Sequence, residues 1–449
     1  LHRVDRRQRQ MCIRDSREWV DAHPTEFVGY DQLVHEGNVI GLVKGGEKVN
    51  DAQQGDEVEV ILDVTPMYAE AGGQMADRGR LIMGETILNV HDVQKIGKKL
   101  WVHKATVQNG GIDLGSTVTA EVDGAWRHGA RQAHTATHLI HAALRQVLGP
   151  TAVQAGSMNK PGYLRFDFNY TEPLSQAQLD EISTITNQAV DADFAVNTIE
   201  TSLEKAKAMG AMALFGENYG DEVRVVEIGG PFSIELCGGT HVGHSSQIGP
   251  VAVLGESSVG SGARRIEAYS GMDSFKYLSK EAALASGLAT ELKTPTEDLP
   301  ERIAQLTERL RAAEKEIENL HRQQLLSNTA DLAAQAETHG KFKVVAVQLP
   351  EGINTGDVRT VANDVRGKLQ TEAAVVVLTS TTAGKVALAV AATPSAVEAG
   401  VKAGDVVKLM GQYIDGKGGG KPDLAQGSGA NPAGVPQALA AVVQELASK

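Results

Sequence analysis

The sequence is short of cysteine, of long apolar runs and of positive charge, and each shortage excludes a class of protein. Two cysteines, Cys12 and Cys237, cannot build the disulfide framework of a small secreted domain, so we expect a reducing, cytoplasmic setting. No run of about 18 apolar residues occurs, and no apolar segment follows the basic N-terminus, which argues against a membrane span and a signal peptide. The net charge of −13 argues against broad, non-specific binding to nucleic acid, although a local basic surface is compatible with it.

The composition is typical of a globular protein with several domains. At about 100–200 residues per domain, 449 residues predict two to four of them. Residues 1–17 contain six arginines and show no helical or strand period, so we interpret them, Cys12 included, as a foreign or disordered leader. The alternative is a basic arm that binds RNA. Residues 18–37 are interpreted as a residual linker.

We expect a multidomain α+β protein. Residues 38–123 hold short runs of β-branched residues separated by Gly, Asn and Asp, which predicts a barrel-like or sandwich-like part. Residues 124–272 alternate helical and strand patterns and predict an α+β domain, whose first helix has Asp123 as its N-cap. Residues 341–449 read as a compact α/β domain with buried strands and two helices.

The segment between them, 273–340, is predicted to be helical. Its apolar residues recur in steps of four and three, which indicates a coiled coil or a helical hairpin. The residues of this seam are Leu299, Ile303, Leu306, Leu310, Ala313, Ile317 and Leu320. The helix is either a spacer packed on its own domain or a contact between two copies of the chain.

Four residues have the spacing and chemistry of a metal site. His134 and His138 in HTATH are four apart and share one helical face, and CGGTH adds Cys237 and His241. A Cys-His₃ set suits Zn²⁺. A satisfied structural histidine is the simpler interpretation of either pair alone. A metalloprotease is disfavoured because HExxH needs a glutamate where Thr135 stands, and a Cys/His protease dyad has no supporting signature.

Two further histidines lie close to these in sequence. His141 is on the same helical stripe, and we expect it to pack or to hydrogen-bond a ligand. His244 follows His241 by three residues and is expected to be a bystander.

Longer motifs resemble one family. The HTATH and CGGTH motifs, TPMYAEAGGQMADRG (65–79), the stretch 202–241 and RRIEAYSG resemble the editing domain of the alanyl-tRNA synthetases. The region 343–449 is similar to their C-terminal domain. The resemblance implies that His134, His138, Cys237 and His241 bind zinc. The ATP- and alanine-binding aminoacylation core of the family has no counterpart here, so we do not expect this chain alone to form alanyl-adenylate.

The resemblance also implies an activity. A pocket shaped for alanine cannot strongly reject glycine or serine, since each difference is worth only about 1–3 kcal/mol, and a second, hydrolytic site removes the errors. We therefore expect hydrolysis of seryl- or glycyl-tRNA(Ala), with binding of tRNA(Ala). The alternatives are a catalytically silent module that binds tRNA and dimerises, and a free-standing deacylase that acts in trans.

Substrate contacts are expected at three places. Gln154 is the candidate contact to the serine hydroxyl, and Gly72, Gly73 and Gln74 would bring backbone N–H groups to the ester or the terminal ribose. Arg264 or Arg265 would hold a phosphate. The simpler interpretations are a loop glutamine, a plain turn and strand-edge arginines. Four protein ligands leave zinc no open position, which favours a structural or anchoring role over activation of water.

The glycine-rich stretch at 411–429, GQYIDGKGGGKPDLAQGSG, is predicted to be a loop. It is not a nucleotide phosphate-binding loop, because Asp415 stands where that pattern needs glycine and Pro422 follows Lys421. Lys417 and Lys421 would contact tRNA through its shape and phosphates. The resemblance implies tRNA binding and dimerisation for this domain, and the alternative is a flexible loop.

Overall fold

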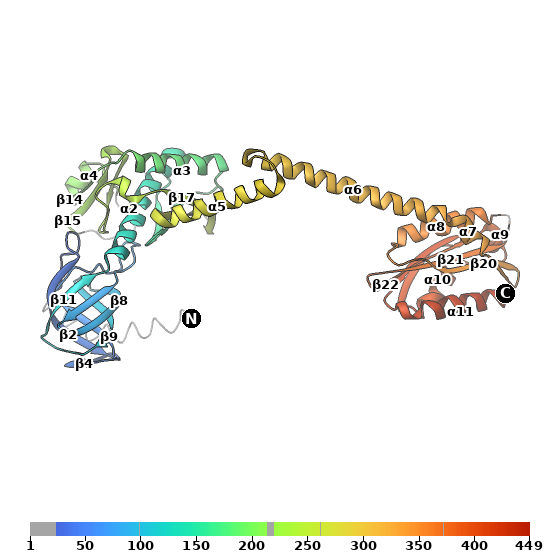
Figure 1. Cartoon of the computed structure of the whole chain (residues 1–449), viewed down its shortest axis with the longest axis horizontal. Coiled ribbons are helices and arrows are strands. Elements are labelled where there is room, and N and C mark those ends of the chain that lie inside the picture. Colours follow the sequence, from blue (N-terminus) through green and yellow to red (C-terminus); the bar gives the residue numbers. More distant parts are fainter. Residues whose placement is uncertain (1–23, 98, 213–219, 261, 371) are drawn as a thin grey trace. The chain divides into compact units, whose positions relative to one another are not determined.

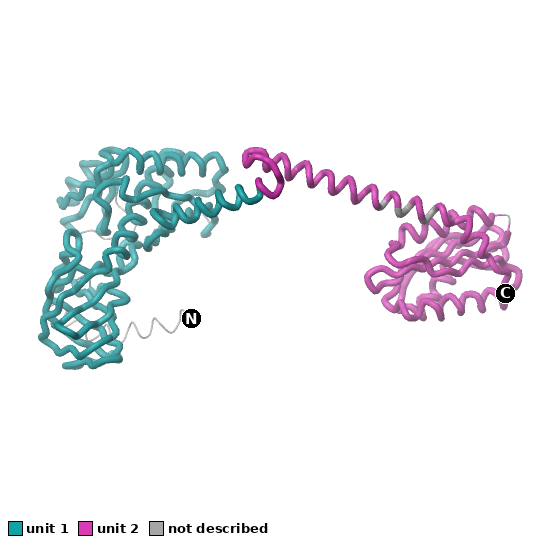
Figure 2. The backbone as a smooth tube through the Cα atoms, viewed as in Figure 1, with its two compact units in different colours: residues 1–288 teal, residues 289–449 magenta. Residues whose placement is uncertain are grey.

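A computed structural model describes residues 24–449, except 98, 213–219, 261 and 371, without the side chains of 318, 321, 322, 325 and 326. The chain divides into two compact units, which we call the N-terminal unit, ending at Leu288, and the C-terminal unit, Ala289–Lys449 (Figure 2). The division falls inside helix α5 (Gly271–Leu292). Among the described residues, no helix is long and apolar enough to span a membrane.

The N-terminal unit begins with a β-barrel (Figure 1). Its sheet has the order β11-β7-β8-β9-β5-β2-β3, and the pairing of β11 with β2 closes it. The strands are β2 (Val34–Lys44), β3 (Glu47–Lys48), β5 (Glu57–Leu62), β7 (Gly79–Met83), β8 (Thr86–Ile96), β9 (Leu100–Asn109) and β11 (Thr117–Val122). Alternate residues such as Leu81, Leu88 and Val118 fill the interior. The barrel begins at β2, within the range predicted as a linker.

Two short strand pairs accompany the barrel. One joins β1 (Glu26–Phe27) to β6 (Val64–Thr65) in parallel, and the other joins β4 (Asp51–Gln53) to β10 (Gly111–Asp113) antiparallel. The first pair attaches the segment before the barrel to β6, so the position of the residues that follow Phe27 is fixed at their start.

The second part of the N-terminal unit packs two helices on a four-stranded sheet. The sheet order is β12 (Gln154–Lys160), β13 (Tyr163–Asn169), β18 (Ala263–Ser270) and β17 (Val251–Gly260). The helices are α2 (Gly124–Leu148) and α3 (Gln176–Asp191). The predicted N-cap Asp123 is present, and Ser175 and Gln178 form a capping box at the start of α3. Leu139 of α2 and Phe166 and Phe168 of β13 belong to the core between these layers.

A three-stranded sheet leads to the CGGTH loop. It consists of β14 (Val196–Ser202), β15 (Glu222–Ile228) and β16 (Ser233–Leu236), with α4 (Leu203–Ala208) packed on it. Short 3₁₀ turns, η1 (Gly230–Phe232) and η2 (Ser245–Ile248), flank β16 and the loop. Because β16 ends at Leu236, the next residue, Cys237, begins the turn.

His103 gives the barrel a dependence on pH. It is fully buried in β9, where Nδ1 bonds to the Val60 carbonyl at 3.0 Å and Nε2 contacts Thr65 Oγ1 at 2.8 Å. Burial lowers the pKa of His103 to about 4, and the bond to Val60 opposes this only in part. The unfolded chain therefore binds more protons than the folded one between about pH 6.5 and pH 4, and stability falls as the pH falls through that window.

We predict that His103→Gln flattens this dependence. Between pH 7.5 and pH 5, the titration of His103 should lower the unfolding free energy by about 2 kcal/mol. The measurement is urea unfolding of both proteins at the two pH values, followed by tryptophan fluorescence, because all three tryptophans precede residue 289. An equal loss in wild type and variant would contradict the prediction.

The C-terminal unit is a mixed sheet with helices on both faces (Figure 1). Its sheet order is β19 (Glu337–His339), β20 (Phe342–Gln348), β21 (Ala374–Thr382), β22 (Lys385–Ala392), β24 (Leu424–Gly429) and β23 (Gly416–Lys421). One core contains α10 (Ala403–Gly411) and α11 (Val435–Ala447), and the other contains α7 (Thr329–Ala334) and α8 (Thr355–Lys368). The short helices α9 (Pro394–Glu398) and η4 (Pro432–Gly434) complete the unit.

The glycine-rich stretch predicted as a loop is instead the hairpin of β23 and β24, packed against α10. A Cβ on Gly418 would lie 2.6 Å from Val407 Cγ1 and 2.3 Å from the Gln426 carbonyl oxygen. Glycine is therefore required there because a helix and a neighbouring strand approach its backbone closely. Lys417 and Lys421 are exposed on β23, which is an edge strand.

Helix α6 (Leu299–Ser327), which follows the turn η3 (Thr296–Asp298), carries the apolar seam read from the sequence. Leu299 is buried, but Ile303, Leu310, Ile317 and Leu320 are 47–60 % exposed. The helix is present as expected, and the partner that would make it a coiled coil stays a prediction.

Candidate metal centre and adjoining pocket

The structure brings the four predicted ligand residues together. Helix α2 presents His134 and His138 one turn apart, and the loop after β16 supplies Cys237 and His241. One ligand atom from each residue can be chosen so that all four lie within 4.8 Å of one another. Cys237 Sγ is 3.4 Å from His134 Nε2. Residues about a hundred positions apart in sequence therefore share one buried cluster.

Each imidazole of the cluster is oriented through its Nδ1 atom. His134 Nδ1 contacts Gln74 Oε1 at 2.9 Å, and His138 Nδ1 contacts Glu235 Oε2 at 3.1 Å. Since an amide oxygen and a carboxylate oxygen only accept, Nδ1 donates in both rings, which leaves Nε2 as the atom that can bind an ion.

The third imidazole follows the same rule. His241 Nδ1 lies 3.2 Å from Thr135 Oγ1, whose hydroxyl donates to the Arg131 carbonyl at 2.7 Å and so accepts from the ring. The Nε2 atoms of His138 and His241 are buried and have no hydrogen-bond partner within the described part of the chain. Buried polar nitrogens without partners, beside a thiol, fit the donor set of a metal ion.

The electrostatics favour a thiolate. Burial raises the pKa of Cys237, but His134 and His241 outweigh it and hold the pKa well below its ordinary value. Burial also lowers the pKa of His138, yet Glu235 raises it to about 10. Burial dominates at His241, whose pKa falls to about 3 although Cys237 opposes the shift. A metal ion requires a thiolate and neutral imidazoles, so the Cys237 thiolate and the neutral His241 suit it, and binding would displace the extra proton of His138.

Gly239 allows the loop to approach α2. A Cβ at this position would lie 2.1 Å from His134 Cε1, so any larger residue would displace the ring. On the same side, the Thr240 N–H donates to Gln74 Oε1 at 2.9 Å, and Gln74 Nε2 donates to Thr240 Oγ1 at 2.8 Å. Gln74 thus ties the loop and His134 to the segment after β6.

A cavity of about 50 Å³ adjoins the cluster. Gln154 lies in its wall and donates from Nε2 to Ser157 Oγ at 3.2 Å. The wall combines hydroxyl groups, the ring of Phe166 and three of the cluster residues. The lining residues are Gly72, His134, Thr137, His138, Gln154, Ser157, Phe166, Glu235, Leu236, Cys237 and Gly238. The wall therefore offers both polar and apolar contacts within a small volume.

The other predicted contact residues are placed differently. Gly73 packs against Ser157, and the Gln74 side chain is buried and bound as described. Arg264 pairs with Glu256, and Arg265 forms two bonds to Asp167 at 2.6 and 2.8 Å. Their roles as substrate contacts stay predictions.

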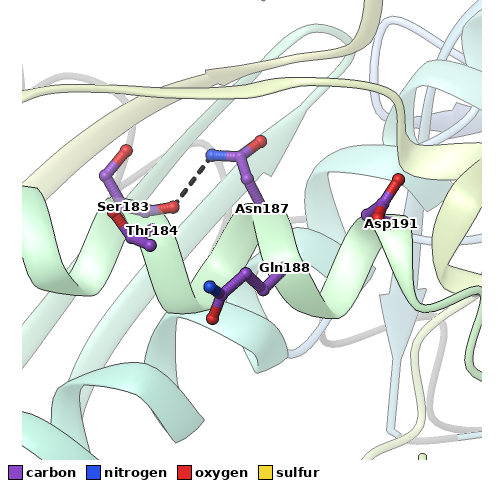
Figure 3. Close-up of a pocket in the computed structure, with 5 residues that line it drawn as sticks. All are labelled: Ser183, Thr184, Asn187, Gln188 and Asp191. Carbon is purple, nitrogen blue, oxygen red and sulfur yellow. Dashed lines mark hydrogen bonds between the residues drawn. The ribbon is translucent and has the colours of Figure 1, made fainter.

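A larger hollow of about 410 Å³ lies on α3 and shares no lining residue with the cavity beside the cluster (Figure 3). It is lined by Ser183, Thr184, Asn187, Gln188 and Asp191, which all come from one helix. Asn187 donates to the Ser183 carbonyl at 2.9 Å and is also bound to Val251. Asp191 is the one ionisable residue of this lining, so the hollow offers little for chemistry.

Sequence reasoning missed the groups that orient the histidines. Glu235 is 2 % exposed and contacts both His138 and His141, each at 3.1 Å. Its signal was a carboxylate inside the apolar strand SIEL, two residues before Cys237. In the sequence Thr135 indicates only that the glutamate of HExxH is absent, whereas in the structure its hydroxyl orients His241.

Three sequence profiles match the chain. The profile of class II (A) tRNA synthetases matches residues 3–126. The profile of the threonyl and alanyl tRNA synthetase second additional domain matches 223–267, which includes the CGGTH loop, and the DHHA1 domain profile matches 341–448. Each describes only a part of the sequence.

Curated relatives match nearly the whole chain. Alanine–tRNA ligase of Corynebacterium glutamicum is 65% identical over 430 residues, which are 96% of this chain and 48% of that protein. The chain is homologous to the alanine–tRNA ligases. The enzyme of Corynebacterium diphtheriae is 63% identical, covering 96% of this chain and 49% of its own length, and that of Mycobacterium avium is 55% identical with the same coverage. The chain thus spans about half the length of the ligases it matches.

One solved structure is also similar in sequence. The C-Ala domain from Aquifex aeolicus alanyl-tRNA synthetase is 26% identical over 25% of this chain and 98% of that domain, with a TM-score of 0.24.

Proposed function

We propose that the N-terminal unit is the editing hydrolase of an alanine–tRNA ligase and cleaves the ester of seryl- or glycyl-tRNA(Ala). One observation carries the proposal. The His134, His138, Cys237 and His241 cluster opens on a small pocket with hydroxyl and amide groups in its wall. Homology to alanine–tRNA ligases over nearly the whole chain supplies the substrate class.

Zn²⁺ is the ion that the cluster would hold. One thiolate and three imidazoles form a borderline-soft set, and the Nδ1 contacts direct each Nε2 toward the shared centre. When bound, zinc would polarise an ester carbonyl or a water, or with four protein ligands would anchor the pocket wall. Gln74, Glu235 and Thr135 hold the rings in the tautomer that such an ion needs.

The pocket wall suggests how serine would be distinguished from alanine. Gln154 and Ser157 are hydrogen-bonded to each other, and Thr137 lines the same space. A serine hydroxyl could join these groups, whereas the methyl group of alanine would interrupt them without replacing a bond. Alanyl-tRNA would then be spared. Glycine has no hydroxyl group to form this hydrogen bond, so the small volume of the cavity is the property that would matter for glycyl-tRNA.

We assign tRNA docking to the C-terminal unit. Lys417 and Lys421 are exposed on edge strand β23, where they are accessible to phosphates. The exposed seam of α6 would contact a second copy and produce a homodimer.

The decisive experiment supplies the chain with tRNA(Ala) carrying serine, glycine or alanine. We expect seryl-ester hydrolysis well above buffer and at least about tenfold faster than alanyl-ester hydrolysis, from the loss of one hydrogen bond to a polar pocket. Binding of the tRNA is measured separately by gel shift. Binding without hydrolysis, with one zinc per chain, would reject the hydrolase in favour of a silent tRNA-binding module.

A further inference from the structure

Three consecutive carbonyl groups of the CGGTH loop are bound from the outside by two side chains. Arg224 Nη1 donates to the carbonyls of Cys237 at 3.2 Å and Gly239 at 2.8 Å. The Tyr30 hydroxyl donates to the carbonyl between them, that of Gly238, at 2.8 Å. We call this pair, Arg224 and Tyr30, the carbonyl clamp.

The two clamp residues also fix each other. The Arg224 guanidinium lies over the Tyr30 ring, with 4.1 Å between its carbon and the ring centroid, a cation–π contact. Tyr30 is held in turn through its backbone, since Arg131 Nη2 donates to its carbonyl at 2.9 Å. Arg224 belongs to β15, whose backbone carbonyl at this position accepts from the Cys237 N–H at 3.0 Å.

The loop needs such support because of its sequence. Two successive glycines, Gly238 and Gly239, have no side chains to restrict them, and ordering them costs more conformational entropy than ordering other residues. Gly239 cannot be replaced, because His134 occupies the space of a Cβ. The restriction that a side chain would give must therefore come from contacts to the backbone.

The clamp and the cluster use different atoms of the same loop. Cys237 Sγ belongs to the cluster and Gly238 lines the pocket, whereas the carbonyls of the same two residues accept from Arg224 and Tyr30. The Gly239 N–H, in contrast, points to Cys237 Sγ at 3.4 Å. A loop held at three consecutive carbonyls would keep its thiolate in one place before the ion arrives.

We propose that Arg224 and Tyr30 are positioning residues that preorganise the CGGTH loop for the metal ion. The proposal rests on the metal centre of the proposed function. It joins two segments that separate family profiles match, because Tyr30 lies within 3–126 and Arg224 within 223–267. The segment before the barrel therefore becomes part of the metal centre.

The test uses the full chain with Arg224→Met, Arg224→Lys and Tyr30→Phe. Controls are Arg80→Met, which removes an exposed arginine paired with Glu121, and Tyr163→Phe, which removes a tyrosine hydroxyl bound to Glu267 far from the loop in sequence. Zn²⁺ affinity is measured by competition with a chelator. Hydrogen exchange of the peptide covering 237–242 is measured in metal-free protein, and thermal unfolding shows that each variant folds.

Arg224→Met should weaken Zn²⁺ binding about tenfold to a hundredfold and accelerate exchange of the loop amides. Arg224→Lys should retain more Zn²⁺ affinity than Arg224→Met but less than wild type, because lysine lacks the planar guanidinium group and stacks less well on the Tyr30 ring. Tyr30→Phe keeps the ring and should cost about threefold to tenfold. Both controls should match wild type.

The clamp and the metal centre fail in different ways. If wild type binds no Zn²⁺, the metal centre is rejected, and the clamp is then judged by loop exchange in the metal-free protein. Unchanged exchange and unchanged affinity in a folded Arg224→Met protein would overturn the clamp. An equal loss of Zn²⁺ affinity in Arg80→Met would overturn the clamp as well, since the loss would then not depend on contacts to the loop.

Discussion

Cys237→Ala should remove the metal and with it the proposed ester hydrolysis. We expect about one Zn²⁺ per chain in wild type, less than about a tenth of that in the variant, and hydrolysis of seryl-tRNA(Ala) slower by roughly a hundredfold or more. The reason is that the thiolate is the one anionic ligand atom of the set, and His134 and His241 already favour its ionised form. Metal content by mass spectrometry and deacylation of a labelled ester check the two parts.

His244→Ala is the matched control. His244 lies seven residues after Cys237 on the same stretch, but its side chain is about half exposed and it is not a member of the four-residue cluster. We expect wild-type metal content and activity from it. Equal zinc in wild type and Cys237→Ala would refute the four-ligand assignment, and hydrolysis by a metal-free variant would separate the reaction from the ion.

The ligand residues could be predicted from sequence because their signals are local. A helix places residues i and i+4 on one face, so HTATH indicates its histidine pair without any tertiary information, and CGGTH indicates a turn with a thiol and an imidazole. The two motifs could be joined because both fall in one predicted domain and together form a Cys-His₃ set, and the resemblance to a family implies the same four ligands. The structure then brings His138 and Cys237 together although 98 residues separate them.

The orienting groups could not be predicted, because tertiary packing chooses them. Gln74 is 60 positions from His134, and nothing in EAGGQ indicates that its amide, rather than its backbone, faces the cluster. The partner of Arg265 is a second case, because only the register of β13 and β18 places Asp167 opposite it. Side-chain contacts between two strands depend on their pairing register, and the sequence of either strand alone does not give that register.

The hairpin of β23 and β24 shows the opposite error. Glycine has low strand propensity, so GKGGGK read as a loop. In the structure the missing side chains are the reason the strand forms there, because Val407 of α10 lies against Gly418 and Gly427. Strand propensity describes an average environment, whereas the backbone of this strand is approached unusually closely by a helix.

Arg127→Met should strongly destabilise the N-terminal unit. Arg127 joins α2 to the barrel, since its Nε lies 2.9 Å from both oxygens of Asp77 and its Nη2 donates to the Pro66 carbonyl at 2.8 Å. The guanidinium also donates to the Gly29 carbonyl, next to Tyr30. Both charged residues are at most 1 % exposed, so the variant leaves a buried carboxylate without its partner.

We expect a loss of about 3–5 kcal/mol in unfolding free energy, and a melting temperature lower by roughly 6–20 °C. Arg80→Met is the control, because its pair with Glu121 is 52 and 39 % exposed and should contribute less than about 1 kcal/mol. The double variant Arg127→Met with Asp77→Leu should regain part of the loss, since no charge is then buried alone, but the carbonyls of Pro66 and Gly29 still lack a donor. Equal stability of Arg127→Met and Arg80→Met would show that the barrel and α2 do not depend on this pair.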